Sequence, residues 1–187
     1  MKNETASFYP ETRQEWRQWL QENHRSQQSV WVVCYKQQSG KPTVSWSDAV
    51  DEALCFGWID STRKSAGDDR FLQFFTRRKP KSTWSKINKE KVQRLTDEGW
   101  MTPAGHECIE IAKQNGSWSS LDAVEALEIP ADLEQELKSR SGMKAYFLSL
   151  SKSVRKAMLH RLALAKRPET RQKRIGEIVA LISQKAY

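Results

Sequence analysis

The feature that most constrains the fold is a change of hydrophobic period along the chain. Segments 29–37, 57–64 and 70–77 are rich in β-branched and aromatic residues or alternate apolar with polar residues, which is typical of strands. The turn-forming cluster 66–69 joins the last two segments, so they are expected to pair as an antiparallel hairpin. From residue 130 onward, apolar residues recur at helical spacing. The sequence therefore predicts an α+β fold, with a small, mostly antiparallel three-stranded sheet packed with helices, followed by an all-helical C-terminal region.

Residues that favour helix N-termini place helices before, between and after these strands. In the second of these helices, Trp46 and Ala49 begin an apolar stripe, so we expect Trp46 to face the core. In the C-terminal region, Val154 and Met158 keep the same spacing and are expected to be buried. The predicted N-caps are Thr12, Ser47, Ser82 or Ser85, and Thr102.

The sequence divides into an α+β domain over residues 1–118, a connection over 119–129 and a helical region over 130–187. The three cysteines are odd in number and lie far apart, so we expect reduced thiols rather than disulfides or a zinc site. The N-terminus has no apolar run typical of a signal peptide, and no stretch has the roughly 20 apolar residues of a membrane span. We therefore expect a cytoplasmic protein without membrane contact, metal or cofactor.

Charge is segregated along the chain. Residues 63–94 carry a net charge of +8 and residues 138–187 carry +11, whereas residues 95–137 carry −9. One interpretation is that the acidic block partly neutralises the basic blocks inside the folded protein, because charge runs are usually solvated faces. The other is that the basic blocks meet an anionic partner. The charge pattern leaves both open.

Four segments carry a resemblance to a known family. They are ALCFGWIDSTRK at 53–64, DDRFLQFFTRRKPKSTWSKIN at 68–88, MTPAG at 101–105 and AKRPETRQKRI at 165–175. Together they resemble the YdeI/OmpD-associated family, also labelled bacteriocin-protection proteins, over about residues 8–183. The family pattern usually has a glycine where this chain has Ser61 and a proline where it has Arg77, so these two turns are expected to differ. The resemblance implies a cytosolic α+β protein linked to stress or to protection against antimicrobial peptides.

A surface that combines arginine and aromatic side chains is the candidate ligand site. Arginine forks bind carboxylate or phosphate groups in a bidentate manner, and aromatic rings supply stacking, so we expect an anionic small molecule or a peptide as ligand. Alternation along 57–64 places Arg63 on the face opposite Trp58 and Asp60, so the strands alone do not bring all candidates together. The predicted site comprises Trp58, Asp60, Arg63, Arg70, Phe75, Arg77 and Trp84.

Two alternative interpretations stay open for the basic and aromatic residues. In the first, Trp58 and Trp84 belong to the core and Asp60 pairs with an arginine to lock the sheet. In the second, the basic C-terminal helices bind nucleic acid, because helix-turn-helix proteins place the start of their second helix against bases. That signal is weak, since the usual turn glycine is missing. The residues concerned are Arg171, Lys173 and Arg174.

Motifs of known catalytic sites are absent from the sequence. It contains no phosphate-binding loop, zinc-binding helix or nucleophile elbow. The three histidines are widely spaced, and Cys55 is more simply explained as a small buried side chain than as a nucleophile. The sequence therefore predicts a non-catalytic binding protein, with an enzyme of unrecognised type as a further alternative. The oligomeric state is not predicted.

Overall fold

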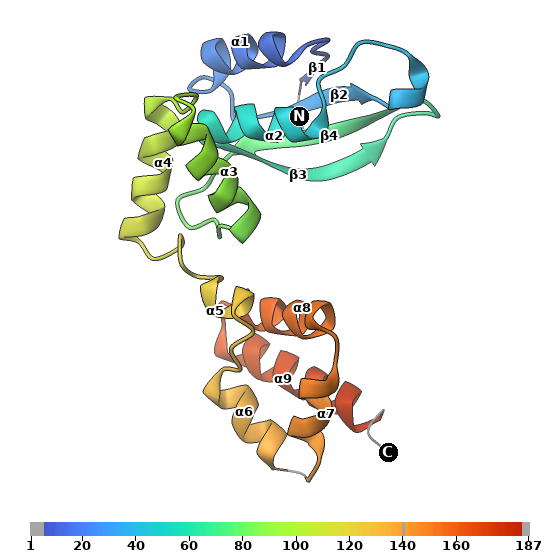
Figure 1. Ribbon diagram of the computed structural model, residues 1–187, viewed down its shortest axis with the longest axis vertical. Coiled ribbons are helices and arrows are strands. Elements are labelled where there is room, and N and C mark those ends of the chain that lie inside the picture. The colour runs from blue at the N-terminus through green and yellow to red at the C-terminus, as the bar shows by residue number, and fades with distance from the viewer. Residues whose placement is uncertain (1–5, 140, 185–187) are drawn as a thin grey trace. The chain divides into compact units, whose positions relative to one another are not determined.

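The computed structural model describes residues 6–139 and 141–184, which form two compact units (Figure 1). The first unit ends at Trp118 and the second begins at Ser119, and each has its own buried apolar core. Residues 1–5, 140 and 185–187 of the predicted regions lie outside the described residues.

The first unit contains a four-stranded mixed sheet in the order β1-β2-β4-β3 (Figure 1). The three long strands pair antiparallel, which confirms the predicted hairpin and its neighbour. The prediction of three strands is wrong by one, because β1 adds a parallel pairing with β2. A two-residue strand is too short to show a hydrophobic period. The strands are β1 (Ser7–Phe8), β2 (Ser29–Tyr35), β3 (Trp58–Ser65) and β4 (Arg70–Arg77).

Helices of the first unit begin close to the predicted residues, with one shift that matters. Thr12 caps the first helix through its side chain, as predicted. The second helix is capped by Ser45 rather than Ser47. Trp46 is therefore the first helical residue; it is 48% exposed, and its indole donates to Asp60 (3.0 Å). The prediction that Trp46 faces the core is wrong. The helices are α1 (Arg13–Asn23), α2 (Trp46–Cys55), α3 (Lys86–Asp97) and α4 (Pro103–Gln114), with a 3₁₀ turn at Gln37–Ser39.

One face of the sheet packs on the helices. Every second residue of β2 is buried on this face, beginning with Val30 and Val32, and the residues between them are only half-buried. Trp16 of α1 lies against Phe75 of β4, with ring centroids 5.2 Å apart, and its indole donates to the backbone of α2 at Ala49. This side is called the core face below.

A β-bulge in β3 changes which side chains share a face. Asp60 pairs with Phe75 and Arg63 pairs with Gln73, so three steps along β3 correspond to two along β4. Asp60 and Arg63 therefore both lie on the core face. The prediction that they occupy opposite faces is wrong, because the extra residue shifts the alternation by one position.

The second unit is helical throughout its described residues, as predicted. The short helix α5 lies within the segment predicted as a connection, and its Val124 is buried in the second core. Val154 is 42% exposed, so its predicted burial is wrong, whereas Met158 and Leu162 are buried. Residues four apart drift by about 40° around a helix, which carries Val154 out of the buried stripe. The helices are α5 (Asp122–Glu125), α6 (Ala131–Lys138), α7 (Met143–Ser149), α8 (Lys152–Ala163) and α9 (Pro168–Ser183).

Candidate anion-binding pocket

A pocket of about 290 Å³ lies where the end of α1, the link between α2 and β3, the end of β4 and helix α4 meet. Its lining combines apolar side chains with three arginines and one glutamate. We call it the anion-binding pocket, after the ligand class proposed for it below, and its lining includes Arg25, Trp58, Arg77, Arg78, Glu107 and Cys108.

Two glycines allow the walls of this pocket to approach closely. Gly57 has a φ of +71°, and a Cβ there would lie 3.1 Å from the backbone oxygen of Ala104 and 3.2 Å from the Cβ of Cys108. A Cβ on Gly105 would overlap with the backbone oxygen of Cys55. Only glycine allows the positive φ at Gly57 and the close backbone approach at both positions without displacing the backbone. The start of α4 consequently packs directly on the end of α2, and segments 53–64 and 101–105 meet at the pocket.

Arg78 is the most unusual residue of the pocket lining. Its relative exposure is 8%, and among the described residues no carboxylate lies within ion-pair distance of it. One guanidinium nitrogen donates to the backbone oxygen of Thr83 (2.8 Å), while the buried Nε has no hydrogen-bond partner in the described part of the chain. Buried charges are normally paired. Arg78 therefore carries donors that no part of the described protein satisfies.

Burial makes the charged form of Arg78 unfavourable, although the side chain remains charged at neutral pH. The guanidinium lies over the ring of Trp84, 3.7 Å from its centroid, and Trp84 is itself buried. Burial lowers the pKa of Arg78 from 12.5 to about 10, and the smaller opposing effects of Cys108 and Asp60 do not offset it. At neutral pH the side chain remains protonated. The pocket therefore presents a desolvated positive charge, which strengthens its interaction with an anion.

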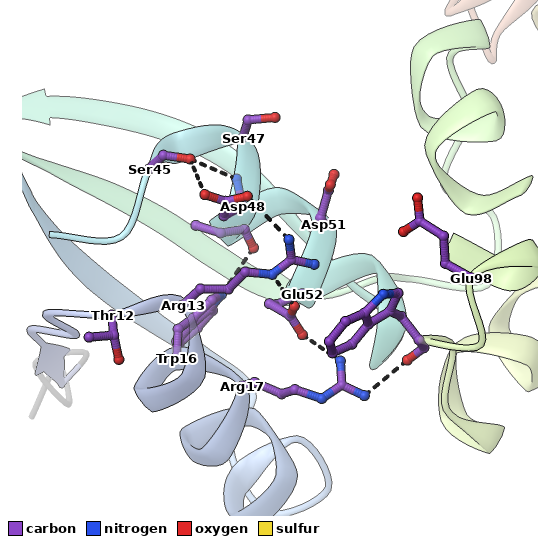
Figure 2. A network of polar contacts seen from close by, with 12 residues as sticks. Thr12, Arg13, Trp16, Arg17, Ser45, Ser47, Asp48, Asp51, Glu52 and Glu98 are labelled. Carbon is purple, nitrogen blue, oxygen red and sulfur yellow. Dashed lines mark hydrogen bonds and ion pairs between the residues drawn. The ribbon is translucent and has the colours of Figure 1, made fainter. Parts of the chain in front are cut away.

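Other buried clusters of the first unit show what a paired arginine looks like. Figure 2 shows Arg13 and Arg17 of α1 pointing toward Glu52 of α2. Both nitrogen-to-oxygen distances are 2.5 Å, and the Glu52 side chain is fully buried. The neighbouring carboxylate of Asp51 receives Lys91 and Arg94. These arginines are structural, and Arg78 has no comparable partner.

Arg77 and Trp58 are fixed at the pocket by the same acceptor. The Nε of Arg77 (2.7 Å) and the indole of Trp58 (3.3 Å) both donate to the backbone oxygen of His24, at the C-terminus of α1. A cation is favourable there because helix carbonyls carry partial negative charge. The terminal nitrogens of Arg77 have no protein acceptor in the described residues. They remain available to a ligand.

Cys108 supplies a thiol to the pocket wall. Burial raises the pKa of this thiol, and the nearby positive charge of Arg78 opposes that rise. Cys34 and Cys55 are more deeply buried, and burial raises their pKa values to about 11. Among the described cysteines, Cys108 alone is accessible, so it can report on the pocket in solution.

The structure separates the seven predicted site residues into three groups. Trp58 and Trp84 are each 1% exposed and belong to the first core, which confirms that part of the first alternative. Trp58 and Arg77 also border the pocket, and Trp84 lies beneath Arg78. Phe75 is fully buried in the core, and Arg70 lies at the far end of β4, about 23 Å from Arg77 at strand spacing. Asp60 and Arg63 are the third group, outside the pocket.

Asp60 and Arg63 are joined by a buried glutamine. Gln73 is 2% exposed; its amide donates to Asp60 (3.3 Å) and its oxygen accepts from Arg63 (3.2 Å). The guanidinium of Arg63 also lies over the ring of Phe71, 4.2 Å from the centroid. One interpretation of the sequence was that Asp60 pairs with an arginine, but no described arginine lies within ion-pair distance of it. Gln73 makes the link instead and fills the bulge of β3.

The basic residues at the start of α9 are mostly engaged within the second unit. Arg171 binds Asp132 through two nitrogens and also donates to the backbone oxygen of Leu162. Arg174 donates to the backbone oxygen of Arg161. Lys173 is exposed. Two of the three residues predicted for nucleic-acid contact therefore already have intramolecular partners.

The predicted site does not include Arg78, which stands in the run Arg77-Arg78-Lys79. The signal that distinguishes it is its position one residue beyond the end of β4, in a segment rich in buried aromatics.

None of the described helices is long and apolar enough to cross a bilayer. Within the described residues, no group of three or more acidic, histidine or cysteine side chains is arranged to hold a metal ion.

Comparison with protein families divides the chain at nearly the same place as the structure. A family model described as a domain of unknown function, DUF8412, matches residues 8–108, more than half of the chain. The chain belongs to the DUF8412 family. The model described as "Bacteriocin-protection, YdeI or OmpD-Associated" matches residues 126–185, which confirms the family resemblance in this region. The region 8–183, over which the sequence suggested one family, is thus matched by two family models. The residues that line the anion-binding pocket lie in the part matched by DUF8412, with the exception of Ile111. Neither the curated proteins nor the solved structures contain a match to the chain.

Proposed function

We propose that this protein is a non-catalytic binding protein of bacterial stress or antimicrobial resistance, which acts in the cytoplasm and holds an anionic small molecule or a peptide carboxylate in the anion-binding pocket. The description of the family matched by residues 126–185 names bacteriocin protection and supports this biological setting. The absence of recognised catalytic motifs in the sequence supports the non-catalytic role.

The single observation that carries the binding proposal is Arg78. Its guanidinium is buried, lines the pocket and has no carboxylate partner among the described residues. Keeping such a charge in a folded protein is unfavourable unless something else compensates for it. A ligand that brings a negative group into the pocket would satisfy Arg78 and the free nitrogens of Arg77 together. Carboxylate and phosphate match the fork of arginine, and the apolar side chains of the lining would contact the rest of the ligand.

Ligand-dependent thermal stabilisation tests the proposal. All eight tryptophans precede residue 119, so tryptophan fluorescence follows the melting of the first unit alone. The probes are inorganic phosphate, acetate, and short peptides that end in a free carboxylate or in an amide. A ligand at 100 times its Kd adds about 2.7 kcal/mol, which raises the Tm by several degrees. We expect a shift with an anionic probe and none with the amidated peptide.

Two pocket variants and one matched control complete the test. Arg78→Met and Arg77→Ala should abolish the shift, and Arg77→Ala should leave the unliganded Tm within a few degrees, because a half-exposed charge contributes little to folding. Arg17→Met removes an arginine that belongs to the Glu52 cluster and should retain the shift. The proposal is wrong if no anion raises the Tm, or if Arg78→Met responds like the wild-type protein.

A further inference from the structure

The face of the sheet opposite the core face has a composition of its own. Of the strand residues that the pairing register places there, none is buried, whereas the core face carries the buried residues of β2 and β4. We call this the outer face. Its residues used below are Trp31 and Tyr35 of β2, Lys64 of β3, and Arg70 and Phe74 of β4.

Aromatic rings stand side by side at the centre of the outer face. Trp31 and Phe74 are direct cross-strand partners, and their ring centroids lie 4.6 Å apart. Tyr35 lies further along β2 and meets Tyr9 edge-on at 5.2 Å. Trp31, Tyr35 and Phe74 are half-buried, whereas α1 and α2 pack on the other side of the sheet.

All charged residues of the strands on this face are basic. The ammonium of Lys64 lies 4.6 Å from the ring centroid of Trp31. Arg70 donates to the backbone oxygen of Ala66, and neither Lys64 nor Arg70 has a carboxylate within ion-pair distance in the described chain. Lys41, at the rim beside Tyr35, is by contrast paired with Asp69. Two unneutralised cations therefore flank the aromatic rings.

We propose that the outer face binds single-stranded nucleic acid, with bases stacked on Trp31 and Phe74 and phosphates held by Lys64 and Arg70. Aromatic rings on an open sheet stack unpaired bases irrespective of sequence, and nearby cations follow the phosphate backbone. The charge of the face favours this occupant over a second copy of the chain, since symmetric pairing would bring Lys64 and Arg70 against like charges. The proposed site is independent of the anion-binding pocket and of the C-terminal helices.

Fluorescence anisotropy with the full-length protein tests the proposal. The probes are labelled ten-nucleotide oligo(U) and oligo(dT), together with a DNA duplex of the same length, at about 50 mM salt. We expect both single strands to bind and the duplex to bind at least about tenfold more weakly, because paired bases cannot stack on the sheet. The logarithm of the binding constant should fall with the logarithm of salt with a slope of about −1.4, which corresponds to two phosphates.

Variants locate the binding surface. Trp31→Leu and Phe74→Leu keep apolar volume but remove the rings, and each should weaken binding at least about fivefold. Trp46→Leu removes an equally large exposed ring from α2 and should change binding less than twofold. Lys64→Gln and Arg70→Gln should each make the salt slope shallower by about 0.7. This readout remains decisive if the loss of an aromatic ring unfolds the protein.

Several results would overturn the proposal. They are the absence of single-strand binding, equal affinity for the duplex, an equal effect of Trp46→Leu, and unchanged salt slopes in both charge variants. Loss of binding in an Arg171→Ala, Arg174→Ala double mutant, with normal binding by Phe74→Leu, would assign nucleic acid to the C-terminal helices instead. A wild-type dimer in sedimentation that Trp31→Leu converts to a monomer would make the outer face an interface between copies.

Discussion

Replacement of Arg78 by methionine is the perturbation that best separates a binding residue from a structural one. Methionine keeps the unbranched apolar stem that packs on Trp84 and removes the charge and its donors. If Arg78 stabilised the fold like a member of a buried ion pair, breaking that pair would cost about 3–5 kcal/mol. In the structure it has no such partner in the described residues, so we expect a different result.

The expected change follows from two opposing effects. Lowering of the pKa of Arg78 from 12.5 to about 10 corresponds to about 3 kcal/mol of unfavourable free energy for the charged form in the folded protein. This penalty is fully present below pH 10, because the side chain is then charged in both the folded and the unfolded protein. Methionine relieves it. Against this gain stand the hydrogen bond to Thr83 and the contact of the charge with Trp84, together worth about 2–4 kcal/mol.

Unliganded Arg78→Met should therefore unfold within about 1 kcal/mol of the wild-type protein. Urea unfolding followed by tryptophan fluorescence measures this quantity for the first unit, since all eight tryptophans lie there. The matched control is Arg17→Met, which removes one partner of the fully buried Glu52 and should cost about 1–3 kcal/mol. A loss of 3 kcal/mol or more in Arg78→Met would refute the reasoning and make Arg78 a structural residue.

Three further predictions concern packing and pH. Gly105→Ala should destabilise the first unit by about 3 kcal/mol in the same urea assay, because the added carbon overlaps with the backbone of Cys55. Gly176→Ala has open space around the added carbon and should stabilise its helix by about 1 kcal/mol, measured by circular dichroism. Equal effects of the two substitutions on stability would contradict this explanation. Gln73→Leu should cost about 1–3 kcal/mol by fluorescence, since it leaves the polar groups around the bulge without their partner, and an unchanged stability would count against the link. The hydrogen bond from Arg171 lowers the pKa of Asp132 below 3.8. The stability lost in Asp132→Asn should therefore be constant at neutral pH and should vanish as the pH falls through the lowered pKa. A difference in stability between the two proteins that persists in acid would show that this ion pair is not the cause of the loss.

The sequence predicts those parts of the fold that depend on local patterns. Alternation and turn residues located the three long strands, and the capping residues Thr12 and Thr102 located the starts of α1 and α4. Such signals depend on a few neighbouring residues, so they can be interpreted without knowledge of the tertiary structure. The errors concern features set by distant partners. Trp46 is exposed because its helix begins two residues earlier than expected and its indole donates to Asp60.

The candidate site was predictable only in part for the same reason. Trp58 and Arg77 lie close together because Trp58 begins β3, Arg77 ends the neighbouring antiparallel strand β4, and the two residues pair directly. Burial without an ionic partner is a property of the whole first unit, and no spacing in the sequence reveals that Arg78 lacks a carboxylate. The bulge that brings Asp60 and Arg63 to one face depends likewise on Gln73 of the partner strand.

The most direct test of the central claim is the reactivity of Cys108 toward two reagents that differ in charge. Iodoacetate carries a carboxylate and iodoacetamide is its neutral counterpart, and Cys108 is the accessible thiol of the described chain. The ratio of the two alkylation rates, measured by mass spectrometry, is insensitive to the thiolate fraction because that fraction enters both rates equally. We expect the ratio of the iodoacetate rate to the iodoacetamide rate to be well above that of a small free thiol at Cys108, and to return to the free-thiol value in Arg78→Met. A ratio that is the same in both proteins would contradict an anion-binding role for this pocket.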